Sequence, residues 1–198
     1  GAMDGPGFAE ELAVGLSANG SLTSLNISDN GFGIHWRADE SEDEDEDGEE
    51  PVKHGVIAII DAINTMGALT SVNILSNEIG ANQANELIAI MASKPNLKTL
   101  CGFSGEETEL DLSNQQATTG CLVLVSNEVN NIGALVKLNM SGNAFYYEEA
   151  GKTLGDMLAA NTVLKELDLS KCRMQAESIR AFAVGLSTNG TLKKLRME

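Results

Sequence analysis

Residues 22–30 read LTSLNISDN, and this pattern decides the fold because it returns along the chain. Close copies stand at 69–77 (LTSVNILSN), 135–143 (LVKLNMSGN) and 164–172 (LKELDLSKC), with a degenerate copy at 109–115 (ELDLSNQ) and a truncated one at 192–197 (LKKLRM). All follow L-x-x-L-x-L-x-x-N/C with a basic spacing of 28 or 29 residues. This periodicity predicts a solenoid in which each unit packs against its neighbours.

The residue types within the unit explain its expected shape. Leu25 and Ile27 point to one face of a short strand and Asn26 points to the other, so one face is buried. Asn30 stands where the chain turns away, and an asparagine there can bond backbone groups that the turn leaves unpaired. Cys172 is a small buried substitute at the same position.

Helical periodicity follows the strands. Apolar residues recur at i, i+3, i+4 and i+7 in two segments, or with similar helical spacing in a third: Ala84, Leu87, Ile88 and Met91; Ile179, Phe182, Ala183 and Leu186; and Ala150, Leu154, Met157 and Leu158. Residues 9–22 repeat the last helix and turn at an offset of 170. We therefore expect an α/β solenoid with helices on the convex side. Its strands are centred on Leu25, Val72, Leu110 or Leu112, Leu138, Leu167 and Leu195, and pair in parallel and in sequence order.

The strand pattern, the full helix and the repeat length resemble the ribonuclease-inhibitor-like class of leucine-rich repeats. The resemblance covers most of residues 8–198 and implies a horseshoe that recognises proteins on its concave face. We expect residues 1–3 to be an expression scar and 4–198 to form a single domain of about six repeats, either a fragment of a longer protein or a short solenoid.

Two insertions interrupt the period. Residues 38–51 hold ten carboxylates and no apolar residue between Ala38 and Pro51, which favours a solvated, disordered loop. Loose divalent-ion binding and electrostatic attraction of a basic partner are the alternatives. The second insertion, 101–109, reads as a glycine-containing loop in which Phe103 either plugs the bulge or contacts a partner.

Composition narrows the function. A net charge of −16 disfavours nucleic-acid binding, and no run of 18 apolar residues exists to span a membrane. The three cysteines, Cys101, Cys121 and Cys172, lack metal-ligand spacing and indicate reduced, buried thiols in a cytoplasmic or nuclear protein. Oligomeric state is left open.

Strand alternation supplies the candidate binding residues. Those expected to point outward, together with the single tryptophan beside the acidic insertion, are Asn26, Asn73, Glu109, Asp111, Lys137, Asn139, Glu166, Asp168, Lys194, Arg196 and Trp36. The four carboxylates predict a negative patch in the middle of the face, which Lys137 interrupts. Lys194 and Arg196 predict a positive C-terminal end. We therefore expect a partner to place a basic region over Asp111 and Asp168.

Catalysis fits this sequence poorly, since no hydrolase, zinc-protease or nucleotide-binding motif occurs and both histidines flank the acidic insertion. We predict a non-enzymatic recognition or scaffold module without cofactor or metal. One alternative is a GTPase-activating protein of the Ran-regulator type, a family similar in its repeats and acidic stretch, for which Asn30 and Arg37 would be the candidates. The other alternative is a repeat segment of a larger sensor.

Overall fold

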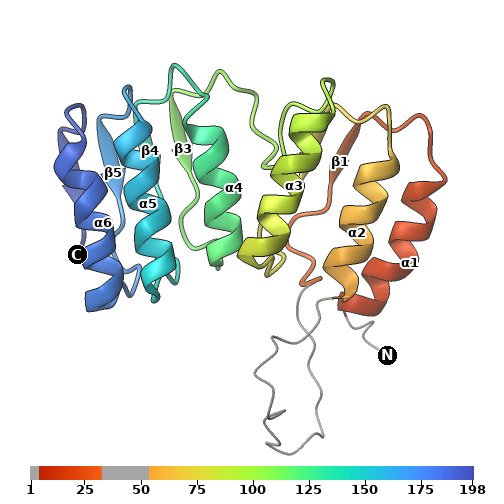
Figure 1. The fold of residues 1–198 in the computed structure, drawn as a ribbon, viewed down its shortest axis with the longest axis horizontal. Helices are drawn as coiled ribbons and strands as arrows, with labels where there is room; N and C mark the ends of the chain where they lie inside the picture. The colour runs from red at the N-terminus through yellow and green to blue at the C-terminus, as the bar shows by residue number, and fades with distance from the viewer. Residues whose placement is uncertain (1–4, 33–53) are drawn as a thin grey trace, which may run out of the picture.

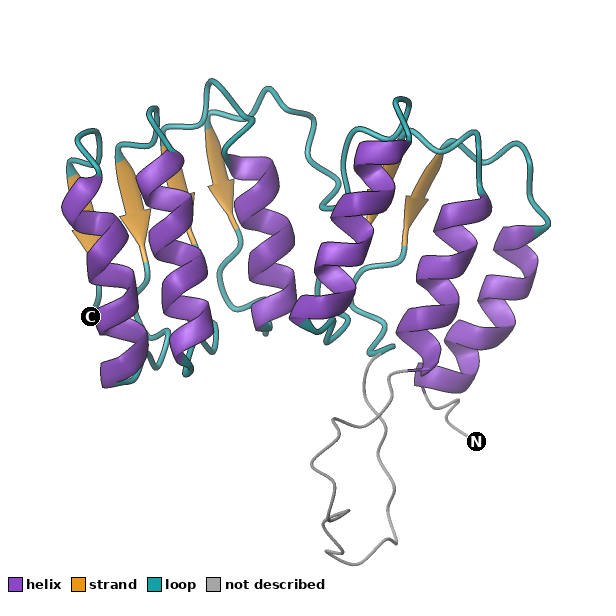
Figure 2. Ribbon diagram, in the orientation of Figure 1, coloured by secondary structure: helices purple, strands orange, loops and turns teal. Residues whose placement is uncertain are grey.

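The computed structural model describes residues 5–32 and 54–198, which form an α/β repeat solenoid. Its helices are α1 Gly5–Ser17, α2 His54–Thr65, α3 Ala81–Ser93, α4 Thr119–Val129, α5 Glu148–Ala160 and α6 Ala176–Thr188. Its strands are β1 Ser24–Asn26, β2 Ser71–Asn73, β3 Glu109–Asp111, β4 Lys137–Asn139, β5 Glu166–Asp168 and β6 Lys194–Arg196. The helices stand side by side in one layer and the strands form a second layer behind them (Figures 1 and 2).

The strands are centred where the repeat predicts, and each paired neighbour is parallel. They form a two-stranded sheet, β1–β2, and a four-stranded sheet, β3–β4–β5–β6, each in sequence order. The central residues Leu25, Val72, Leu138 and Leu167 are buried in the core between the two layers. Leu110 and Leu195, on the edge strands β3 and β6, are only half-buried.

Within the described residues the ladder is broken between β2 and β3, so the expectation of pairing throughout in sequence order is wrong at this point. Residues 97–101 take the place beside β2 instead. The N–H groups of Val72 and Ile74 donate to the carbonyls of Thr99 and Leu100 at 2.9 and 3.1 Å. The insertion then carries the chain away from β2 before β3 begins. Its first residue, Cys101, makes only an isolated antiparallel bridge to Asn73.

A buried carboxylate compensates for the lost ladder. Glu128 on α4 is 7% exposed, and its oxygens accept hydrogen bonds from the Thr99 hydroxyl at 2.7 Å and from the N–H groups of Leu100 and Cys101. Burial raises the pKa of Glu128, although these hydrogen bonds act in the opposite direction. The side chain therefore satisfies backbone donors that would otherwise pair with the next strand.

The insertion itself is a structured loop. The carboxylate of Glu107 accepts from the N–H groups of Ser104 and Gly105, the latter at 3.0 Å, and from the Ser104 hydroxyl at 2.9 Å. Phe103 is half-buried against the core, in agreement with the plug alternative.

Asparagine side chains at the expected position of the repeat link the turns that follow neighbouring strands. The Asn77 amide donates to the carbonyls of Ile27 and Ile74 at 2.7 and 2.9 Å. Asn143 bonds the backbone of its own and the preceding repeat in the same way, and the Cys172 thiol donates to the Met140 carbonyl at 3.1 Å. The repeated Asn/Cys position thus links neighbouring repeats through their backbones.

The helices confirm most of the predicted apolar positions. The four predicted residues of α5 are buried, and in α3 Ala84 and Leu87 are buried while Ile88 and Met91 are half-buried. The helix α2 buries a stripe with the same spacing, formed by Val56, Ile59, Ile60 and Ile63. In α6, Phe182 is buried and Leu186 is half-buried against the core, but the predicted stripe is wrong at Ile179 and Ala183, which are exposed, and the helix also buries Ser178 and Gly185. All three cysteines are free and buried. The acidic insertion 38–51 lies outside the described residues.

Candidate functional site

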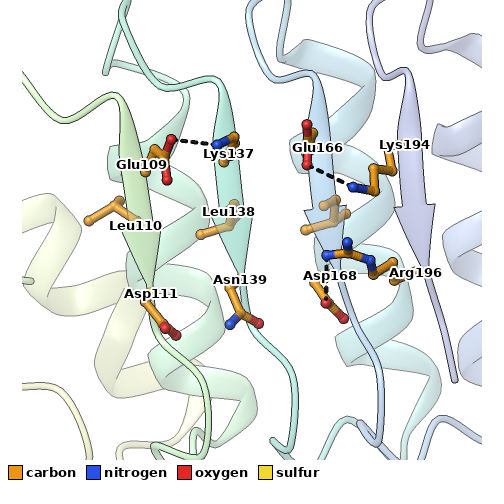
Figure 3. Close-up of a pocket in the computed structure, with 11 residues that line it drawn as sticks. Glu109, Leu110, Asp111, Lys137, Leu138, Asn139, Glu166, Asp168, Lys194 and Arg196 are labelled. Atoms are coloured by element: carbon orange, nitrogen blue, oxygen red, sulfur yellow. Dashed lines mark hydrogen bonds and ion pairs between the residues drawn. The ribbon is translucent and has the colours of Figure 1, made fainter.

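The outward surface of β3–β6 forms a shallow hollow of about 310 Å³ on the side away from the helices. We call its polar residues the strand face: Glu109 and Asp111 of β3, Lys137 and Asn139 of β4, Glu166 and Asp168 of β5, and Lys194 and Arg196 of β6 (Figure 3). Leu110, Leu138 and Leu167 lie beneath them as the floor. The in-register parallel pairing arranges the polar residues in two rows across the strands.

The first row alternates in charge from strand to strand: Glu109, Lys137, Glu166 and Lys194. The Lys137 ammonium lies 2.6 Å from the Glu109 carboxylate, and the Lys194 ammonium lies 3.4 Å from that of Glu166. The hydrogen bond that Lys137 donates to Glu109 raises the pKa of Lys137. These side chains stay between 38% and 60% exposed, so the pairs lie at the surface and remain open to solvent.

The second row consists of Asp111, Asn139, Asp168 and Arg196. The Arg196 guanidinium lies 3.5 Å from the Asp168 carboxylate, whereas Asp111 has no cation paired with it among the described residues. Hydrogen bonds from Ser113 lower the pKa of Asp111. For Asp168, burial would raise the pKa, but hydrogen bonds from Ser170 and the charge of Arg196 outweigh it and lower the pKa.

The charge pattern corrects the expected negative patch. Three of the four carboxylates on the strand face pair with a cation on the next strand, and only Asp111 is left over. Four carboxylates against three cations give the face a net charge of −1. A basic partner attracted over Asp168 would have to compete with Arg196. These ion pairs could have been predicted from the sequence repeat, because the paired residues hold equivalent positions in neighbouring units.

The side chains of the second row also stabilise the turns that follow the strands, a role that was not predicted from the sequence. The side-chain oxygens of Asp111, Asn139 and Asp168 accept from the N–H two residues further on, at 3.0, 3.0 and 2.9 Å. Asn26 and Asn73 do the same in β1 and β2. The signal was present as an Asn or Asp followed two residues later by Ser in most copies, which is typical of Asx turns.

The candidates on the N-terminal sheet lie apart from the strand face. Asn26 is exposed on β1. Asn73 on β2 is half-buried beneath the insertion, because a Cβ placed on Gly102 would lie 3.0 Å from the Asn73 Cβ. Trp36 lies outside the described residues. The structure therefore brings together eight of the eleven predicted residues, those on β3–β6.

Of the two residues considered for a GTPase regulator, only Asn30 lies among the described residues. The Asn30 side-chain amide donates to the carbonyls of Ile27 and Ser28, both at 3.0 Å, so its hydrogen bonds support the turn. Arg37 lies outside the described residues. Over the ranges 5–32 and 54–198 no cluster of three His, Cys, Asp or Glu side chains could hold a metal ion, and no helix is long and apolar enough to cross a membrane.

A comparison with protein families agrees with the repeat architecture. A family model described as "Leucine Rich repeat" matches residues 18–33 and 160–183. Among solved structures, the chain is similar to the C-terminal domain of tropomodulin from Caenorhabditis elegans, with a TM-score of 0.40, 13% identity and coverage of 91% of this chain and 92% of that one. Among curated proteins none matches. The chain is thus an α/β repeat solenoid in which two segments match the leucine-rich repeat model, and the finer ribonuclease-inhibitor-like assignment stays a prediction.

Proposed function

We propose that this chain is a non-enzymatic protein-recognition module that binds its partner on the strand face. The observation that carries the proposal is the in-register array of charged side chains across four neighbouring strands. Leucine-rich repeats supply a protein-interaction surface of this kind, because stacked repeats present a long strand surface that the core does not need.

The charges of the strand face contribute little to holding the fold together. Exposed ion pairs typically contribute between zero and about 1 kcal/mol to stability. The side chains of Glu109, Lys137 and Lys194 are 46–60% exposed, and the buried leucines of the same strands supply the packing. Seven charged residues on a surface that stability does not require are better explained by recognition than by folding.

Acid–base catalysis does not suit the same residues. General acids and bases work best with a pKa near the operating pH. The pKa values of Asp111 and Asp168 are instead lowered, so both remain ionised near neutral pH. The one carboxyl group with a raised pKa among the described residues, Glu128, is buried on α4 and bonded to backbone N–H groups.

A competition experiment tests the proposal. A photo-crosslinker replaces Asn139 on the strand face, and captured proteins from the source cell are compared with and without an excess of unlabelled chain. Unlabelled wild-type chain and the helix-surface variant Asp156→Lys should both abolish capture, whereas the strand-face variant Glu166→Lys with Asp168→Lys should not. Equal competition by both variants would show that the strand face is not the binding site. Acceleration of GTP hydrolysis by the purified chain would overturn the non-enzymatic assignment.

A further inference from the structure

The strand face has a direction as well as a pattern. β3 at one edge contributes two carboxylates, Glu109 and Asp111, and β6 at the other edge contributes two cations, Lys194 and Arg196 (Figure 3). Between these edges the first row continues the alternation of sign, with Lys137 on β4 next to Glu109. A complementary segment must therefore begin with a cation over β3, end with an anion over β6, and alternate in between.

The spacing of this pattern selects the kind of segment. Neighbouring strands lie about 4.8 Å apart, so the charges of the first row recur at about that interval across the sheet. Side chains on one side of an α-helix recur about every 5.4 Å, whereas those on one side of an extended peptide recur about every 6.7 Å. Over the three intervals from β3 to β6, the side chains of a helix move out of register with the strands by about 2 Å, and those of an extended chain by nearly 6 Å. Only the helix keeps each of its charges over the intended strand.

We propose that the partner segment is an α-helix lying across β3–β6, with its N-terminal end over β3 and a cationic, anionic, cationic, anionic series at i, i+4, i+7 and i+11. The proposal rests on the recognition function proposed above. Orientation follows from the helix dipole, whose positive N-terminal end faces Glu109 and Asp111 and whose negative C-terminal end faces Lys194 and Arg196. Twelve residues span about 17 Å, enough to cover the roughly 14 Å from the first to the fourth strand.

The internal ion pairs of the strand face do not prevent this docking. Each pair lies between neighbouring strands at the surface, so a helix placing an opposite charge above each member extends the pair into a network. Asp111 offers a carboxylate that no cation of the described chain pairs with, which favours a cation at the first position of the helix. Asn139, beside it, adds an amide that can bond a polar side chain.

Two peptides of identical composition test the pattern. Both are 14-residue lysine/glutamate helices on an alanine background, one with Lys, Glu, Lys, Glu at i, i+4, i+7 and i+11 and the other with the two residue types exchanged. Binding to the full chain is measured by fluorescence anisotropy at low salt, with helicity matched by circular dichroism. We expect the lysine-first peptide to bind about tenfold more tightly. The exchanged peptide can place each charge over an opposite one only with its helix direction reversed, which turns both dipole interactions, at β3 and at β6, unfavourable.

A matched variant of the protein inverts the row without altering its balance. Glu109→Lys, Lys137→Glu, Glu166→Lys and Lys194→Glu together keep both ion pairs and the net charge but cancel the charge difference between β3 and β6, so the preference between the two peptides should disappear. Equal affinities of the wild-type chain for the two peptides, absence of measurable binding, or the same preference in both proteins would overturn the helix proposal. The recognition function fails separately, through the crosslinking competition described above, since that experiment does not depend on the form of the partner segment.

Discussion

The first and last helices of the chain contain the same five residues in different surroundings. Residues 13–17 and 183–187 both read AVGLS. In α6 the glycine, Gly185, lies so close to α5 that an added Cβ would be 1.9 Å from the Gly155 carbonyl oxygen. In α1 the equivalent Gly15 has nothing within 4 Å of such a Cβ. The repeat predicts that both segments are helices, but the neighbouring helix decides which residues are constrained.

The difference arises because the two helices pack through opposite sides. α1 packs on the following helix, α2, and buries Ala9, Ala13 and Leu16. α6 packs on the preceding helix, α5, through the side that carries Ser178 and Gly185. An apolar stripe read from sequence therefore marks the side of a repeat helix that can be buried, while packing partners determine the side that is.

The largest expected effect breaks this comparison at its glycines. Gly185→Ala should lower the free energy of unfolding by about 3 kcal/mol, because the new methyl group meets backbone and the helices must separate. Gly15→Ala should raise it by up to about 1 kcal/mol, since alanine favours the helix and meets no neighbour. Urea denaturation of both variants measures the two values. Shifts of the same sign would mean that α5 and α6 are not packed through their glycines.

The two sheets form a second comparison. β1–β2 presents Ser and Asn outward, whereas β3–β6 presents charged residues. The junction between them depends on Glu128, whose carboxylate binds Thr99, Leu100 and Cys101. A single buried acid, on a helix with no other charged residue, thus lies between the neutral part of the solenoid and the charged part.

Removing this acid should have the next largest effect. Glu128→Ala leaves the buried N–H group of Leu100 without its acceptor and leaves that of Cys101 with the Thr99 hydroxyl alone, and we expect a loss of about 2 kcal/mol in unfolding free energy. Amide hydrogen exchange should accelerate at these two positions more than within β4 and β5. Unchanged protection at Leu100 and Cys101 would show that another group can take over as acceptor.

A pH series sharpens the same point. Because burial raises the pKa of Glu128 above its ordinary value of 4.5, folding favours the protonated form. Its stabilising contribution is full below pH 4.5 and is lost as the pH rises through the raised value. The stability of the wild-type chain relative to Glu128→Gln should therefore increase as the pH falls from 7 towards 4.5. A difference that stays constant in urea unfolding at several pH values would show that this carboxyl group is not perturbed.

How far the sequence predicts the molecule follows from what repeats. Strand centres, asparagine positions and the burial of α2 and α5 recur with the period, so one unit predicts the others. The break in the ladder after β2 was not predicted. It involves a hydrogen bond from the Cys101 N–H to the Glu128 carboxylate, and these two residues lie 27 positions apart in the sequence. On the strand face, the residues were predicted but not their pairing. Aligning the repeats strand by strand would have placed Glu166 beside Lys194 and Asp168 beside Arg196.

The smallest expected effect concerns the charged strands themselves. Arg196→Gln removes the cation beside Asp168, yet the pair is surface-exposed and its 3.5 Å separation is long, so the unfolding free energy should change by less than about 1 kcal/mol. The same change should weaken partner capture on the strand face, because the second row loses its only cation. Lys193→Gln, outside the strand face, is the matched control and should alter neither quantity. If Arg196→Gln instead destabilised the chain strongly and left capture intact, the charges of β3–β6 would serve the fold, and the contrast between the neutral and the charged sheet would have no bearing on recognition.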